Sequence, residues 1–219
     1  MERVITVKGI GKINVKPDQI ILSIQIKAQD KSYEKTLQIA NEQMDNLRNA
    51  VVSCGIEKND LKTKNFSIDT NYDSIRDKND NYRRVFKGFV CDQHLNLKLP
   101  LDMILLAAVL SALSDSHANP EFSIRFTLAD SNQISEDLLI DATKNAFQKA
   151  KILTKAADAT LGDLLNINYN WGEIDIYSQT ESRLNQYKMV DFGFDSSAVD
   201  IVPEDIQVSD TVSFVWEIK

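Results

Sequence analysis

Apolar residues recur at steps of three or four between Ala129 and Gly162, which is the spacing of one helix face. The face consists of Ile134, Leu138, Ala142, Ala146, Ala150, Leu153 and Ala157. Because four of these seven residues are alanine, a neighbouring segment can approach the helix backbone closely. Short polar side chains from Asp130 to Ser135 can cap the first turn, and Gly162 can end the helix in a left-handed conformation. The pattern predicts one long helix, around which the rest of the chain is organised.

The same kind of pattern predicts two more helices. One begins at a cap at Asp30 or Ser32 and ends at Gly55. Its apolar stripe is formed by Tyr33, Leu37, Ala40, Met44, Leu47 and Val51. The segment Leu101–Leu113 is apolar on nearly every side, which is typical of a short buried helix.

Between the helices, apolar and polar residues alternate as they do in half-buried strands. The predicted strands are Val4–Lys8, Ile10–Val15, Gln19–Gln29, Phe66–Tyr72, Val85–Leu99, Phe122–Leu128, Asp163–Trp171 and Val208–Ile218. Two polar segments interrupt this pattern. We expect Asp73–Arg83 to be an exposed hairpin tip and Gly172–Asp205 to be a long loop.

The order strand, long helix, glycine, strand, strand occurs twice, in residues 19–99 and 121–219. Because short hairpins join the paired strands, the sheets should be mainly antiparallel, with the helices covering one face. We therefore predict an α+β fold with two long helices and a short buried one, in a single domain over residues 1–219 with an internal pseudo-repeat.

Composition and charge narrow the class of protein. The chain has a net charge of −7, which argues against a nucleic-acid-binding protein because phosphate contacts need a basic surface. Its longest apolar run, Met103–Leu110, is far shorter than the about 20 residues of a membrane span. Met1 leads directly into a β-rich segment without the apolar core of a signal peptide. If Met1 is the native start, we expect a cytoplasmic protein, whereas a trimmed leader would make it periplasmic or extracellular.

Residues that could carry chemistry are few. The only two histidines, His94 and His117, show no spacing that suggests a metal site, and the cysteines Cys54 and Cys91 form no CxxC pair. We interpret both cysteines as free thiols, one at a helix end and one in a strand. No nucleophile–base pair or cofactor loop is recognisable, so we predict no catalytic residue, no metal, no cofactor and no enzyme.

Three other patterns have a structural and a functional interpretation. Gly9 and Gly11 resemble part of a phosphate-binding loop, but a strand follows them instead of a helix, which favours a β-turn or bulge. The basic group Arg83, Arg84 and Lys87 beside Tyr82 and Phe86 could contact a phosphate or lipid headgroup, although a solvated strand end is the default. The acidic residues Asp73, Asp77 and Asp80 do not have the spacing of an EF-hand loop.

Aromatic residues are unusually frequent in and beside the polar segment that precedes the last strand. They are Trp171, Tyr177, Tyr187, Phe192 and Phe194. Aromatic side chains are enriched in protein interfaces, so these five residues are the candidate contact to another subunit or partner. Packing onto their own domain is the alternative.

Four segments, taken in order, resemble the SIMPL-domain proteins, formerly a domain of unknown function and also called the periplasmic 26-kDa antigen and oxidative-stress defence family. The first is ITVKGIGKINVKPDQIILSI at Ile5–Ile24, and the second is GIEKNDLKTKNFSIDTNYD at Gly55–Asp73. The third contains the long alanine-rich helix and its L-G ending, and the fourth is the closing strand VPEDIQVSDTVSFVWEI. The resemblance implies an α+β fold, large ring-like or channel-like oligomers in some members, and a role in envelope integrity or stress tolerance.

We therefore expect a non-enzymatic protein that acts through self-assembly or protein contact, as a homo-oligomer. The expected contact elements are the alanine-rich helix, the Asp73–Arg83 tip and the Gly172–Asp205 segment. The alternative is a small-molecule-binding module with an apolar pocket between the helices and the sheet.

Overall fold

The computed structural model describes residues 3–76, 82–170, 176–184 and 201–219. The chain divides into two compact units, each built from separated stretches of sequence. The first unit contains Met1–Asp18, Thr127–Gln179 and Pro203–Lys219, and the second contains Gln19–Phe126 and Thr180–Val202. Helices and antiparallel strands occur in both units, which confirms the predicted α+β class. The prediction of a single domain with an internal pseudo-repeat stays a prediction.

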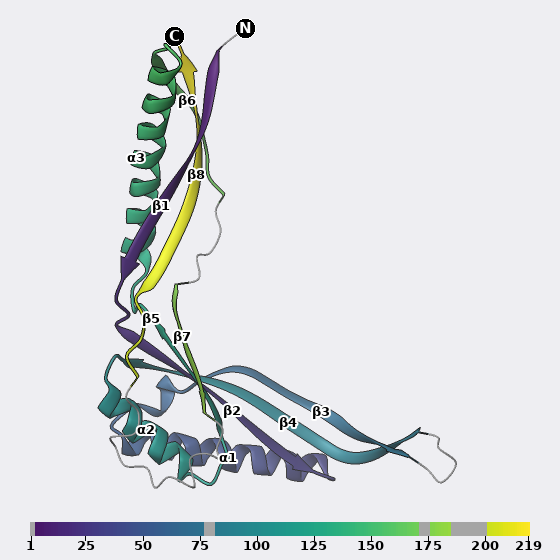
Figure 1. The fold of residues 1–219 in the computed structure, drawn as a ribbon. Coiled ribbons are helices and arrows are strands. Elements are labelled where there is room, and N and C mark those ends of the chain that lie inside the picture. Colours follow the sequence, from purple (N-terminus) through teal and green to yellow (C-terminus); the bar gives the residue numbers. More distant parts are fainter. Residues whose placement is uncertain (1–2, 77–81, 171–175, 185–200) are drawn as a thin grey trace. The chain divides into compact units, whose positions relative to one another are not determined.

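The first unit is a three-stranded antiparallel sheet with one long helix on one face (Figure 1). The strands lie in the order β1 (Val4–Val15), β8 (Ile206–Ile218) and β6 (Leu161–Asn168), and the helix is α3 (Asn132–Ala156). Alternate residues of β1 and β8 point at the helix and are buried, because side chains on a strand alternate between its two faces. The core between the two layers consists of Val7, Ala142, Ala146, Ala150, Val212, Phe214 and Trp216.

The second unit is a larger antiparallel sheet with two helices packed on one face (Figure 1). Its strand order is β3 (Lys62–Arg76), β4 (Tyr82–Pro100), β2 (Gln19–Asp30), β5 (Glu121–Thr127) and β7 (Tyr177–Leu184). The helices are α1 (Tyr33–Ser53) and α2 (Met103–Ser114), and a 3₁₀ turn at Lys58–Asp60 follows α1. Leucine and isoleucine side chains from the sheet meet both helices in one core, which includes Leu22, Ile24, Leu47, Leu97, Leu106 and Phe126.

The ends of α1 and α2 are as local chemistry predicts. Gly55 has a φ of 79°, and the N–H of Ile56 bonds back to the carbonyl of Val51, so this glycine ends α1 as expected. At the start of α2, the Asp102 carboxylate accepts bonds from the N–H groups of Ile104 and Leu105, at 2.8 and 3.1 Å.

The end of α3 was predicted wrongly. The helix stops at Ala156, and Asp158, with a φ of 52°, takes the left-handed position that the sequence assigned to Gly162. The N–H of Ala159 then bonds to the carbonyl of Thr154, which closes the last turn. Aspartate tolerates this conformation better than most residues, and Gly162 instead lies inside β6.

Several strand boundaries also differ from the prediction. Val4–Lys8 and Ile10–Val15 form the single strand β1, and β6 begins and ends earlier than Asp163–Trp171. Strand β7 lies within the segment that was predicted to be a loop. Both strands of the hairpin extend into the predicted tip, since β3 continues to Arg76 and β4 begins at Tyr82.

Candidate functional site

The aromatic residues that the sequence assigns to an interface lie mostly outside the described residues. This applies to Trp171, Tyr187, Phe192 and Phe194. Tyr177 is described and is the first residue of β7, with its side chain at the surface. The predicted aromatic contact therefore stays a prediction.

The alanine-rich face of α3 is an internal contact. Ala142, Ala146 and Ala150 are fully buried against the sheet of the first unit. A methyl group added at Gly9 would overlap the carbonyl of Ala142, and one at Gly11 would overlap the carbonyl of Leu138. The prediction of close approach to this face is confirmed. Its use as an assembly surface is wrong, because β1 already occupies it.

Gly9 and Gly11 therefore serve packing. Both lie in a continuous strand, paired with Val212 and Asp210 of β8, so the predicted turn or bulge at these positions is wrong. A side chain at either position would push α3 away from the sheet. A strand and not a helix follows these glycines, so they do not form a phosphate-binding loop.

The outer edge of β1 is covered by polar side chains of α3. Asn145 Oδ1 accepts a bond from the N–H of Ile10 at 3.1 Å, and Asp141 Oδ2 accepts one from the N–H of Lys12 at 3.0 Å. Lys149 Nζ donates to the carbonyl of Lys8 at 3.1 Å. Residues 141, 145 and 149 are four apart and so form one row on the helix. This row replaces a neighbouring strand and closes the β1 edge to further strand pairing.

The opposite edge of the same sheet is different. No described residue outside β8 forms a hydrogen bond with the backbone of β6. Leu164, Leu165 and Ile167 on this strand are all about half exposed. Each has relative exposure near 50%, which is high for a large aliphatic side chain. Among the residues that the structure describes, the β6 edge is thus an open strand edge with an apolar surface.

In the second unit, aromatic rings form a continuous chain on the hairpin of β3 and β4. Tyr33 contacts Phe89, Phe89 contacts Phe86, and Phe86 contacts Tyr72. The ring centroids of these three pairs are 5.5, 5.5 and 5.6 Å apart, all in edge-to-face geometry. The guanidinium of Arg84 lies 4.9 Å from the Tyr72 ring centroid, in cation–π geometry.

This surface, here called the aromatic face, continues the helix-covered side of the sheet beyond the start of α1. Cys91, on the same phase of β4, packs under Ala40 of α1, and Phe89 is the last residue of β4 that pairs with β2. Farther out, the two strands have no helix above them (Figure 1). The aromatic face consists of Tyr33, Tyr72, Tyr82, Arg84, Phe86 and Phe89.

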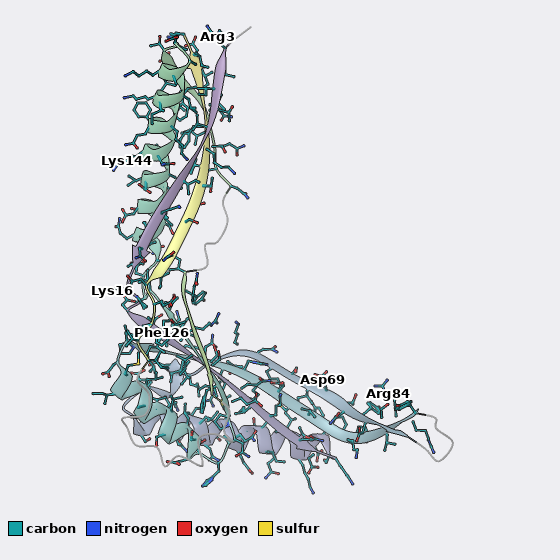
Figure 2. The ribbon with its side chains drawn as sticks, viewed as in Figure 1. Arg3, Lys16, Asp69, Arg84, Phe126 and Lys144 are labelled. Atoms are coloured by element: carbon teal, nitrogen blue, oxygen red, sulfur yellow. The ribbon has the colours of Figure 1, made fainter. Side chains whose placement is uncertain are left out.

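The charges of the hairpin are divided between its two sides. The carboxylates of β3 and the described part of β4, on Asp69, Asp73 and Asp92, occupy the strand phase opposite the rings. On that other side, Lys87 Nζ lies 3.4 Å from the Asp73 carboxylate. Figure 2 shows Arg84 toward the far end of the hairpin, beyond Asp69. The aromatic face therefore has a cation and no carboxylate from these two strands.

A polar network lies on the side of the second sheet that faces away from α1 and α2. Gln25 Nε2 donates to both oxygens of Asp92, at 3.0 and 2.8 Å, and His94 Nε2 lies 3.2 Å from Asp92 Oδ1. An open hollow of about 310 Å³ lies beside them, lined by Ser23, Ile24, Gln25, His94, Glu121, Phe122 and Ser123. This hollow can accept polar groups.

The histidines and acidic residues do not gather into a metal site in the described part of the chain. No cluster of three or more His, Cys, Asp or Glu side chains is found there. His94 lies in β4, and His117 lies in the turn after α2 with a φ of 58°.

Both cysteines are free, as the sequence indicates. Cys54 caps the end of α1, whereas Cys91 is fully buried in β4 beside Ala28 and Ala40. Burial raises the pKa of the Cys91 thiol. This side chain therefore behaves as a small apolar core residue and not as a nucleophile.

The layer between the helices and the sheet of the second unit is filled by core side chains, including Leu47, Leu95 and Leu110. The hollow described above and a second one beside Asp45 and Lys58 are instead open and lined in part by polar side chains. In the part of the chain that the structure describes, no helix is long and apolar enough to cross a membrane.

The sequence pattern does not indicate either open surface. Tyr82 and Phe86 stand out only as neighbours of a basic group, and the leucines of β6 do not stand out. The signal in the sequence for the aromatic face is the group Tyr72, Phe86 and Phe89, which lies near the ends of two strands that extend farther than the helix packed on them.

Comparisons with known proteins identify the family of this chain. Residues 5–216 match the model of the SIMPL family, described as a protein of unknown function (DUF541). The chain is 25% identical over 164 residues to the 26 kDa periplasmic immunogenic protein of Brucella melitensis biotype 1. It is equally similar to the protein of the same name from Brucella abortus. Each alignment covers 75% of this chain and 65% of the relative, so the chain spans less than two thirds of their length.

The names of these relatives place those proteins in the periplasm, which does not support the cytoplasmic prediction. The family match covers nearly the whole chain and includes both units. The chain belongs to the SIMPL family.

Proposed function

We propose that this protein acts by self-association, as a non-enzymatic component that contacts further copies of itself. The observation that carries the proposal is the contrast between the two edges of the three-stranded sheet. The β1 edge is closed by Asp141, Asn145 and Lys149, whereas the β6 edge is open and has three exposed aliphatic side chains. An apolar open edge is a template for pairing with another chain.

The family resemblance supports a role of such an assembly in envelope integrity or stress tolerance. The periplasmic names of the two relatives agree with an envelope location for those proteins. Deletion of the gene in its host, followed by growth under membrane and oxidative stress, tests this role. Sensitivity that the wild-type gene reverses is the expected result.

Co-capture tests self-association directly. Two copies with different affinity tags are produced in one cell, and one tag is used for purification. We expect the second copy to be recovered with the first. Ile167→Lys should reduce this recovery, because it places a charge on the open edge, whereas Lys144→Ala on α3, on the side away from the sheet (Figure 2), should not. Recovery of the tagged copy alone would contradict the proposal.

A second candidate function rests on the hollow beside Gln25, Asp92 and His94. Its lining of amide, imidazole, hydroxyl and carboxylate groups would suit a polar small molecule. Saturable thermal stabilisation by a metabolite, lost in Gln25→Ala, would favour this function over assembly.

A further inference from the structure

We propose that the aromatic face of the β3–β4 hairpin is a second contact surface, which binds an acidic region of another copy of this chain. This inference rests on the proposed self-association and adds to it a surface in the other unit. Its starting point is that the aromatic face has no described covering layer, although its neighbour Cys91 is fully buried under α1.

The side chains of the aromatic face are of the kind found at the centres of protein interfaces. Tyr33, Tyr72 and Phe86 are between 44% and 48% exposed, and Tyr82 is 73% exposed. Tyrosine, phenylalanine and arginine are enriched at interfaces, and the two aromatic side chains combine a large contact area with only two side-chain torsions. The edge-to-face ring contacts hold Tyr33, Tyr72 and Phe86 in place before any partner binds, which lowers the entropic cost of binding.

Charge identifies the partner as another copy. The chain has a net charge of −7, whereas the aromatic face has Arg84 and no carboxylate from the described parts of its two strands. Arg84 lies over Tyr72, and no carboxylate of a described residue lies within ion-pair distance of it. A cationic aromatic surface is therefore complementary to an acidic region, and a second copy of a chain in which carboxylates outnumber basic side chains can supply one.

The same charges determine the geometry of the contact. Two aromatic faces placed against each other would offer Arg84 no carboxylate from β3 or β4, so the face does not pair with itself. The contact is heterologous, with a different surface on the second copy, and repeated heterologous contacts give a ring or a filament. Together with the open β6 edge, the chain then has two distinct surfaces for assembly.

Arg84 and its neighbour Arg83 provide a matched pair of variants. Arg84→Glu reverses the charge on the aromatic face, whereas Arg83→Glu makes the same change on the opposite side of the same strand, since adjacent strand residues point to opposite faces. Light scattering across a dilution series gives the concentration at which the assembly dissociates. Arg84→Glu should raise this concentration about tenfold or more, and Arg83→Glu should change it less than threefold.

Two further measurements separate assembly from folding. Circular dichroism and melting temperature should be the same for both arginine variants, because both positions are exposed.

A photo-crosslinking amino acid in place of Tyr82 should give covalent dimers, with the crosslink on an acidic peptide of the other copy. Higher salt should weaken the wild-type assembly more than the Arg84→Glu assembly, because salt screens the charge attraction.

The outcomes distinguish the two proposals. Wild-type protein that is monomeric at every concentration overturns both. An assembly that Ile167→Lys disrupts and Arg84→Glu leaves intact overturns only the role of the aromatic face. A loss of thermal stability in Tyr82→Asn, at a side chain that is 73% exposed among the described residues, shows that the face is covered within its own copy, which also overturns the inference. Binding of a monomer to phosphatidylglycerol vesicles, lost in Arg84→Glu, would assign the face to a membrane instead.

Discussion

At the scale of single residues, two glycines set the distance between a strand and a helix. Gly9 and Gly11 lie where any side chain would overlap a carbonyl of α3, and the facing helix residues are alanines. Small residues on both sides let the two backbones approach closely, so the core of the first unit depends on shape as much as on hydrophobic area. The largest side chains of this core, Phe214 and Trp216, stack beside the close contact with ring centroids 5.3 Å apart.

Substitution of Gly9 tests this contact. Gly9→Ala should lower the free energy of unfolding by about 1–3 kcal/mol or more, the usual cost of forcing extra atoms into a packed site. The control is Thr6→Ala, on the exposed phase of the same strand, which should change it by less than about 0.5 kcal/mol. Chemical denaturation measures both values. Equal stabilities of the two variants would contradict the close-contact interpretation.

The buried thiol of Cys91 predicts a pH dependence. Its pKa is raised above the ordinary value of 9.0, chiefly by burial, so the native state holds this proton to higher pH than the unfolded state. The corresponding contribution to stability is complete below pH 9 and is lost as pH rises through the native pKa. The hydrogen bond from Tyr169 to Asp210 raises the pKa of Tyr169 and acts in the same direction.

The free energy of unfolding should therefore fall between about pH 9 and 11, and the fall should be smaller in Cys91→Ala. Denaturation at a series of pH values measures this slope. If the free energy of unfolding falls equally with pH in Cys91→Ala and in the wild type, the thiol makes no contribution to the pH dependence. Before unfolding, Cys91 should also react much more slowly with a thiol reagent than Cys54, which is partly exposed.

At the scale of elements, the helix α3 stabilises β1 in two ways. Its alanines pack on the strand, and its row of polar residues satisfies the backbone groups on the strand's outer edge. An unpaired edge strand can aggregate, so this row protects one side of the sheet. Because the β1 edge is protected, a further strand can be added to this sheet at the β6 edge.

Hydrogen exchange can detect this row of contacts. Asn145→Ala removes the acceptor of the Ile10 N–H, and this amide should then exchange faster while the amide of Val7 keeps its protection. The loss of one such bond should also cost about 0.5–1.5 kcal/mol of stability. Lys144→Ala, the neighbouring exposed position, is the control and should leave the Ile10 amide unchanged. An unaltered Ile10 rate in Asn145→Ala would show that the strand edge does not depend on this contact.

The spacing of apolar residues was sufficient to predict the elements whose ends and buried faces depend on residues nearby in the sequence. The stripe of α1 and its ending at Gly55, the apolar helix α2 and the alternation of β5 are all present as expected. The role of Gly9 and Gly11 was not predictable in this way, because their partner lies more than a hundred residues later in the chain. Strand β7 was missed because YSQTESRL has no apolar alternation, and the end of α3 because Asp158 replaced glycine in the left-handed position.

At the scale of the whole molecule, the chain builds two units, each with helices on one side of a sheet. Among the described residues, apolar side chains are exposed at the β6 edge and on α3, at Ile140, Phe147 and Ile152, in the first unit, and on the aromatic face in the second. Sequence patterns could indicate which residues are apolar but not which of them the fold leaves exposed. The alanine face of α3, one of the predicted contact elements, is internal, whereas a contact at the hairpin near Asp73–Arg83 stays a prediction.

The central claim, that this protein acts as an assembly, is tested most directly by its absolute mass in solution. Light scattering behind a sizing column should give a species well above the 24.8 kDa of one chain, which dissociates only on strong dilution. A mass of one chain at every concentration would contradict the claim and move attention to the hollow beside His94.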